Sequence, residues 1–138
     1  MKYRPLKGYK YLLLEDEIYQ LPEEFSEQLI ATPYIALSNE GLLCVKKNYM
    51  WDGPSGPTVD TKSFMRGSLI HDALYQLIRE GFLPATMRKA SDKVLYDICR
   101  QDGMGWFRSQ YVYFFVHKCG GGSVKPREEG VYEEVEIL

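Results

Sequence analysis

Cysteine pairs, long apolar runs and an excess of charge are all missing from this sequence of 138 residues. Its cysteines, Cys44, Cys99 and Cys119, are widely spaced and form no close pair, so neither a disulfide framework nor a zinc knuckle is predicted. We expect them to be reduced and to pack as small hydrophobic side chains. No stretch of about 18 apolar residues occurs, which argues against a transmembrane helix.

The charges nearly cancel, because 17 Lys and Arg residues stand against 19 Asp and Glu residues and leave a formal net charge of -2. Such a chain has no overall field that would draw it to nucleic acid or to an anionic membrane, so we expect no nucleic-acid partner. Residues Met1–Pro5 contain no apolar run and no small-residue cleavage site, so a signal peptide is not predicted. We therefore expect residence in a cytoplasm.

The chain does contain enough apolar sequence for one folded domain, which we expect to span residues 1–138. Hydrophobic residues make up 45% of it, and it is rich in aromatics, with 11 Tyr, 6 Phe and 2 Trp. A chain of this length can bury a sizeable core. The composition therefore predicts a folded protein rather than a disordered one.

The first third of the sequence carries signals for β-strands. Tyr9–Leu14 and Ile18–Leu21 are predicted strands, the second returning after a turn. Tyr34–Leu37 and Leu42–Lys46 read as a hairpin around a four-residue loop that ends in Gly41, where a positive φ is expected. These segments predict a small antiparallel β portion.

Helical signals follow in the second half of the chain. The stretch Leu69–Tyr75 belongs to a predicted helix with an apolar stripe, which Gly81 ends. A second helix is predicted over Met87–Arg100, with Thr86 as its N-cap, and the short link implies antiparallel packing. Trp106–Lys118 is apolar on nearly every side, so it permits a buried helix or a strand, and we favour a helix.

The end of the chain reads differently. Residues 120–130 predict a flexible Gly-rich linker, and Val131–Leu138 alternates apolar with acidic residues as an edge strand does. We therefore predict an α+β fold, in which the N-terminal strands, to which the C-terminal strand could add, pack on two or three antiparallel helices.

The first predicted helix also carries the residues with the clearest chemical potential. His71 lies one turn before Tyr75 on the edge of the apolar stripe, and Asp72 is offset by about 100°. Antiparallel packing can bring Asp92 of the second helix across to His71. An imidazole held by a carboxylate is a plausible general base.

A loop rich in Gly and Pro precedes this helix, over Tyr49–Asp60. It contains Gly53, Ser55 and Gly56, and such a bend can gather backbone carbonyls around an ion, with Asp52 or Asp60 joining them. The alternative is that the loop is an ordinary series of turns.

Several motifs follow one another over roughly residues 40 to 122. They are Trp51-Asp52-Gly53-Pro54-Ser55-Gly56-Pro57, His71-Asp72 with Tyr75, Arg88 with Ala90 and Asp92, and Arg108 before an aromatic segment ending in Gly120. In this succession the sequence resembles a family of small proteins of unknown function that are common in tailed bacteriophages and prophages. The resemblance implies a phage origin, in the host cytoplasm or associated with the virion.

The order of a Gly-rich loop, a helix with His-Asp-x-x-Tyr and a second helix with Asp is also similar, more distantly, to the secreted phospholipase A(2) superfamily. That superfamily includes the domain in parvovirus capsid proteins. The resemblance implies a general base at His71, oriented by Asp92 with Tyr75 as a supporting donor. It also implies calcium bound by Asp72 and the loop, for which the matching positions are Gly53, Ser55, Gly56 and Asp52, and a lipid or other ester substrate.

This sequence departs from that superfamily in three ways. The paired cysteines of most secreted members are absent, prolines stand in the loop where those enzymes have glycines, and the β-rich first third has no counterpart.

Each of these residues also has a purely structural interpretation. His71 and Tyr75 could be core side chains, and Asp72 could favour the N-terminal half of its helix. Asp92 could pair with Arg88 on the surface of its own helix. His117 is expected to be solvated at a helix end.

Two functional hypotheses follow. One is a phage hydrolase that cleaves an ester with a His71/Asp92 dyad and calcium at Asp72. The other is a noncatalytic phage accessory or virion protein, which binds a host or phage protein through its aromatic surface and in which the polar cluster is structural.

Overall fold

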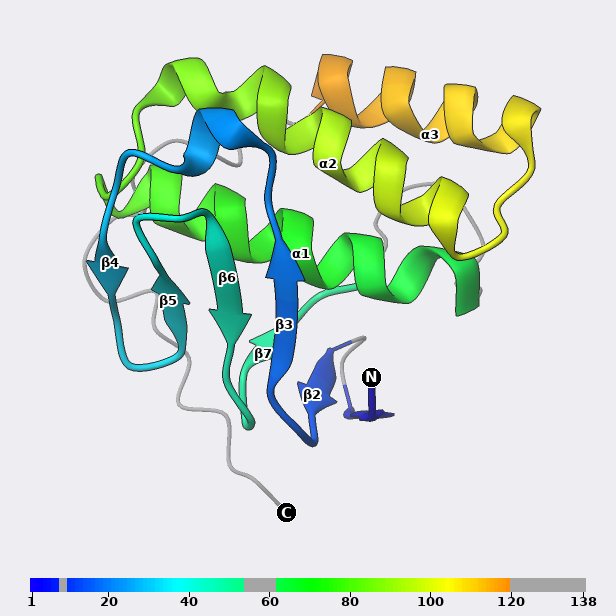
Figure 1. Cartoon of the computed structure of the whole chain (residues 1–138). Helices are drawn as coiled ribbons and strands as arrows, with labels where there is room; N and C mark the ends of the chain where they lie inside the picture. Colours follow the sequence, from blue (N-terminus) through cyan, green and yellow to red (C-terminus); the bar gives the residue numbers. More distant parts are fainter. Residues whose placement is uncertain (8–9, 54–61, 120–138) are drawn as a thin grey trace.

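The computed structural model describes residues 1–7, 10–53 and 62–119 and places strands before helices (Figure 1). The helices are α1 (Lys62–Arg79), α2 (Arg88–Gln101) and α3 (Trp106–Cys119), and short 3-10 turns occupy Glu23–Phe25 and Ala85–Met87. The strands are β1 (Tyr3–Pro5), β2 (Tyr11–Leu13), β3 (Glu17–Gln20), β4 (Ile30–Ala31), β5 (Ile35–Leu37), β6 (Leu42–Val45) and β7 (Met50–Trp51). The predicted α+β fold is confirmed.

The strands are antiparallel and belong to two sheets, with the orders β1-β2-β7 and β3-β6-β5-β4. The predicted hairpin is confirmed as β5 and β6, which pair Ile35 with Val45 and Leu37 with Leu43. These four side chains are buried. Gly41, in the turn between them, has the expected positive φ of 82°.

Two predictions about the strands are wrong. The segments predicted over Tyr9–Leu14 and Ile18–Leu21 do contain β2 and β3, but each strand pairs in a different sheet, β2 with β7 and β3 with β6. Met50 and Trp51, predicted to lie in a loop, form β7. The cause is nonlocal pairing, because the partner of Trp51 is Tyr11, far away in the sequence.

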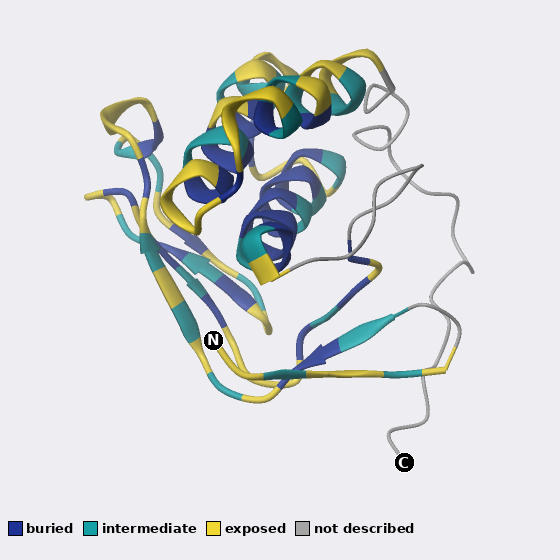
Figure 2. Ribbon diagram, turned by 90° about the vertical axis from the view of Figure 1, so that its right-hand side faces the viewer, coloured by how far each residue is buried: buried dark blue, intermediate teal, exposed yellow. Residues whose placement is uncertain are grey.

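Helix α1 lies at the centre of the packing. Leu69, Ile70, Ala73, Leu74 and Leu77 are fully buried, and they join the sheet residues and α2 in one hydrophobic cluster. Figure 2 shows α1 dark blue on nearly every side, whereas the outer helices are exposed on one face. A helix buried all round holds its polar side chains in a fixed environment.

Successive helices run in opposite directions, as predicted (Figure 1). Helices α1 and α2 approach closely at Gly67, where a Cβ would lie 2.9 Å from Cys99 Sγ. At the same crossing Arg66 donates to both carboxylate oxygens of Asp102, at 3.0 and 2.9 Å. These contacts fix the register between the helices that carry the candidate site.

The predicted N-cap Thr86 is wrong. The cap position of α2 is Met87, whose side chain makes no capping hydrogen bond, because a 3-10 turn after Pro84 leads directly into the helix. The interpretation of 106–118 as a helix is confirmed by α3, but the expected burial is wrong, because its outer face exposes side chains such as Phe107. The predicted linker at 120–130 and the strand at 131–138 lie outside the described residues. Among the residues described, no helix combines the length and the apolar character that crossing a membrane requires.

Candidate functional site

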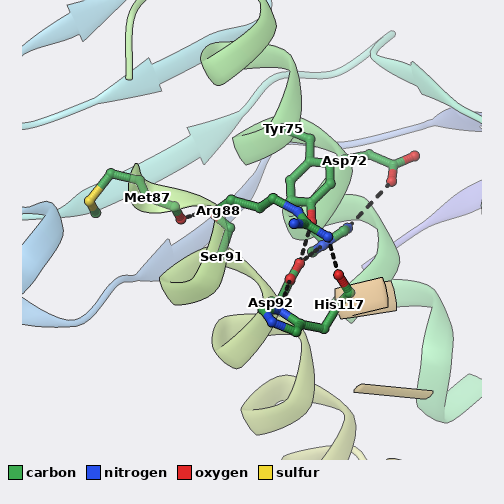
Figure 3. Close-up of polar contacts among 8 residues, drawn as sticks. Asp72, Tyr75, Met87, Arg88, Ser91, Asp92 and His117 are labelled. Carbon is green, nitrogen blue, oxygen red and sulfur yellow. Dashed lines mark hydrogen bonds and ion pairs between the residues drawn. The ribbon is translucent and has the colours of Figure 1, made fainter. Parts of the chain in front are cut away.

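The carboxylate of Asp92 is the centre of a buried polar cluster between the helices (Figure 3). Its Oδ1 accepts hydrogen bonds from the Tyr75 hydroxyl at 2.5 Å and from His71 Nε2 at 2.7 Å. Its Oδ2 lies 3.2 Å from Nδ1 of His117. Asp92 has no exposed surface at all, so neighbouring protein groups rather than water compensate its charge.

The charge of Asp92 decides where the proton of His71 lies. Burial opposes ionisation of Asp92, but the hydrogen bonds from His71 and Tyr75 and the proximity of His71 together lower the pKa of Asp92 below its ordinary value. An ionised carboxylate has no proton to donate, so His71 must donate from Nε2. Neutral His71 therefore carries its lone pair on Nδ1, the atom that a general base requires.

His71 and Tyr75 lie one turn apart on α1, with ring centroids 4.0 Å from each other. His71 is 7% exposed. Burial disfavours its charged form, yet Asp72 and Asp92 outweigh this and raise the pKa of His71. Burial and the hydrogen bond to Asp92 raise the pKa of Tyr75, so its hydroxyl stays protonated and donates. The predicted meeting of His71, Tyr75 and Asp92 is thus present.

Asp72 faces the other nitrogen of His71. Its Oδ1 lies 3.9 Å from His71 Nδ1, and its side chain is about one-third exposed. Burial raises the pKa of Asp72, the imidazole of His71 opposes that rise, and the charge of nearby Asp52 adds to it. The carboxylates of Asp52 and Asp72 therefore repel one another. The described residues contain no group of three or more His, Cys, Asp or Glu that could hold a metal.

The start of the Gly-rich loop is held against the rest of the fold. Trp51 Nε1 donates to Ser68 Oγ of α1 at 3.1 Å. Gly53 has a φ of 73°, and a Cβ there would lie 2.4 Å from the Tyr11 ring, so packing alone explains glycine at this position. Ser55 and Gly56, the other predicted loop ligands, lie outside the described residues.

His117 is a member of the cluster that sequence reasoning missed. It was expected to be a solvated helix end, and its side chain is indeed 45% exposed, but its Nδ1 reaches Asp92. The His117 ring stacks on Tyr113 with an interplanar angle of 3°. The signal in the sequence that could have indicated His117 is its place one helical turn after Tyr113, in the last turn of α3.

Arg88 does not form the surface pair with Asp92 that the structural interpretation proposed. Asp92 is fully buried, and Arg88 donates from Nη2 to the backbone carbonyl of His117. Its guanidinium also stabilises the ionised form of Tyr75, which opposes the rise in the pKa of that hydroxyl. Arg88 therefore joins the end of α3 to α2 beside the cluster.

Comparisons of the chain with protein-family models, with curated proteins and with solved structures found no match.

Proposed function

We propose that this protein hydrolyses an ester, with His71 as the general base that activates water. The supporting observation is the contact between His71 Nε2 and the ionised, fully buried Asp92, which leaves the lone pair of neutral His71 on Nδ1. That nitrogen lies on the side of Asp72, which reaches solvent. General-base assistance of this kind contributes about 10²- to 10⁴-fold to a rate.

The reaction would proceed by two proton transfers, one to Nδ1 of His71 and one from it. As the water oxygen bonds to the ester carbonyl carbon, Nδ1 takes one of the water protons, and the carbonyl oxygen becomes an oxyanion. The bond to the alcohol then breaks, and the leaving oxygen takes the proton from Nδ1. Asp92 stabilises the imidazolium that exists between these steps, because its charge lies 2.7 Å from Nε2.

Calcium is part of the proposal, with Asp72 and Asp52 as carboxylate ligands. Calcium binds about six to eight oxygen ligands, so backbone carbonyls of the Gly53–Gly56 loop and water would complete the set. The electrostatic repulsion between the two carboxylates supports this assignment, because a bound cation would relieve it. When bound, calcium would polarise the ester carbonyl and stabilise negative charge on its oxygen.

The substrate class and the biological source in this proposal come from the two resemblances. Similarity to the phospholipase A(2) superfamily favours a lipid ester, and similarity to phage proteins favours a phage enzyme that acts in the host cytoplasm or in the virion. Both belong to the proposal and are tested separately from the general base.

Purified full-length protein should be assayed with p-nitrophenyl butyrate and with phosphatidylcholine vesicles, in calcium and in EGTA. The decisive variant is His71→Gln, because the Gln amide can still donate to Asp92 but offers no basic nitrogen. We expect at least a 100-fold loss of kcat. Lys93→Ala is the matched control, since it removes an exposed ion pair with Asp97 and a cation–π contact with Tyr96, and should retain wild-type activity.

A wild-type rate that His71→Gln leaves unchanged would exclude His71 as the base. The absence of hydrolysis of both substrates by wild-type protein in calcium would refute the enzymatic proposal. Calorimetric titration with calcium tests the metal separately, because binding should disappear in Asp72→Asn and persist in Lys93→Ala.

The second candidate function, a noncatalytic binding protein, is favoured by the outer face of α3. Phe107 is 83% exposed, and Trp106, Tyr111 and Phe114 are each more than half exposed. Adjacent exposed aromatic side chains are typical of protein interaction sites. In that case the cluster around Asp92 would serve only to join the helices.

A further inference from the structure

Asp92 uses its two oxygens differently. Oδ1 accepts the two hydrogen bonds from α1, and Oδ2 faces α3, where His117 Nδ1 lies 3.2 Å away. Asp92 is fully buried, and among the described residues the hydrogen-bond partner of Oδ2 is His117. The orientation of the carboxylate is therefore set from two sides, by α1 at Oδ1 and by α3 at Oδ2.

His117 is itself held in place by other contacts. Its ring stacks on Tyr113, with centroids 5.9 Å apart, and its backbone carbonyl accepts from Arg88 of α2. Gln110 and Tyr96 tie the preceding turns of α3 to α2 through a hydrogen bond of 2.9 Å. The last turn of α3 is thus fixed against α2, and the imidazole approaches Asp92 from a defined direction.

We propose that His117 is a positioning residue, which donates from Nδ1 to Asp92 Oδ2 and so orients the carboxylate that holds His71. This role rests on the proposed function only in its effect on turnover. The physical reason is that an Asp carboxylate rotates easily about χ2, because the distribution of this torsion angle is broad and roughly two-fold. Without a donor at Oδ2, the carboxylate can turn, and the hydrogen bond to His71 Nε2 lengthens and bends.

The groups around His117 fit this role. Asp92 and Arg88 face it from α2, Tyr113 and Lys118 flank it on α3, and His71 lies beyond Asp92 on α1. The ionised Asp92 accepts, so His117 carries its proton on Nδ1, whatever the state of its other nitrogen. Its half-exposed ring contacts Asp92, which holds His71 at Nε2, so we assign it a role through Asp92 and not as a catalytic residue.

The test uses the full-length protein and NMR at one fixed pH. The chain has only two histidines, so labelling with ¹⁵N-histidine gives two imidazole systems that substitution assigns at once. The Nε2 proton of His71, in a short hydrogen bond to a buried carboxylate, should resonate downfield of ordinary imidazole N–H protons. Its chemical shift reports the geometry of that bond without substrate.

Three variants separate positioning from stability. His117→Ala removes the donor, and His117→Asn keeps an amide N–H close to the position of Nδ1. Lys118→Ala is the matched control, because it alters the same helix end through a cation–π contact with Phe114 and does not touch Asp92. Melting temperatures of all three identify any variant that has lost its fold.

We expect the His71 resonance to move upfield or broaden in His117→Ala, and to keep its wild-type position in His117→Asn and Lys118→Ala. In the hydrolysis assay His117→Ala should lower kcat by up to about 100-fold with KM unchanged, and Asn should restore most of it. An unchanged resonance in His117→Ala, or one equally displaced in Lys118→Ala, overturns the role. A displaced resonance in a protein without esterase activity upholds the positioning role and refutes the proposed function.

Discussion

Asp92→Asn is the most informative single perturbation of this protein. The substitution keeps the size and shape of the side chain, so it leaves no cavity, removes the negative charge and replaces one acceptor oxygen by an amide donor. The amide oxygen can still accept from Tyr75 and His71 at the position of Oδ1. The amide nitrogen then faces His117, which can meet it only by moving its proton to the other ring nitrogen.

The size of the effect follows from the hydrogen bonds of Asp92. A hydrogen bond to a charged group contributes about 1.5–3 kcal/mol, and one between neutral groups about 0.5–1.5 kcal/mol. Neutralising the acceptor of all these bonds therefore costs roughly 3–4 kcal/mol. Part of this cost is offset, because the neutral variant avoids the desolvation penalty of a buried charge. We expect Asp92→Asn to lower the free energy of unfolding by about 2–3 kcal/mol near pH 5.5.

The dependence of this loss on pH has a definite sign. The pKa of His71 is raised by folding, so its stabilising contribution is complete below about pH 6.5 and is lost as the pH rises through the folded-state pKa. The pKa of Asp92 is lowered, so its contribution is complete above about pH 4 and is lost as the pH falls through the folded-state pKa. The difference between wild type and variant should be largest between these limits.

The assay is urea unfolding followed by circular dichroism, at about pH 5.5 and about pH 8.5. Lys93→Ala again serves as the control, since it leaves every contact of Asp92 in place. A loss below about 1 kcal/mol at pH 5.5 would mean that the hydrogen bonds of Asp92 are not charge-assisted. A loss that is equal at both pH values would refute the inference that Asp92 raises the pKa of His71.

Three further predictions concern other parts of the molecule. Gly67→Ala should lower the free energy of unfolding by about 1–3 kcal/mol in thermal or urea unfolding, because its Cβ would meet α2 side-chain atoms at 2.9 Å, whereas Gly105→Ala, which faces open space, should not. Asp72→Asn should raise the melting temperature at neutral pH in EGTA, because a carboxyl whose pKa is raised by folding destabilises the protein once it is ionised. If calcium still raises the melting temperature of this variant, Asp72 is not a calcium ligand. Replacing Phe107 and Tyr111 by Ser should change the free energy of unfolding by no more than about 0.5 kcal/mol, since both side chains are exposed. The same replacement should reduce the fluorescence of the hydrophobic dye ANS bound to the protein. Unchanged dye binding would show that α3 presents no apolar surface.

The parts of the structure that sequence reasoning predicted correctly depend on local signals. The apolar stripe through Leu69 and Leu77 indicates a buried helix, and the short link before α2 makes the two helices antiparallel. This packing made a meeting of His71 with Asp92 possible, but the sequence did not determine which carboxylate would reach His71. The β5–β6 hairpin is local in the same sense, because its turn residue, Gly41, lies between the paired strands.

The parts that were missed depend on partners far away in the sequence. Strand β2 is three residues long, and its pairing of Tyr11 with Trp51 is visible in neither segment. His117 lies on α3, which has apolar residues on nearly every side, so periodicity does not indicate which side of that helix faces α2. Its contact with Asp92 is set by the crossing of α2 and α3, which only the assembled helices determine.

The cluster around Asp92 is costly if its only purpose is to join helices. Burying a carboxylate carries a desolvation penalty that hydrophobic side chains of similar size do not, and such replacements are often neutral or stabilising. Here one fully buried charge satisfies donors from α1 on one oxygen and from α3 on the other. Stability alone does not require that arrangement, whereas a charged acceptor at Nε2 both fixes the tautomer of His71 and stabilises its imidazolium. The energetic cost of the site therefore favours a chemical role for His71 over a structural one.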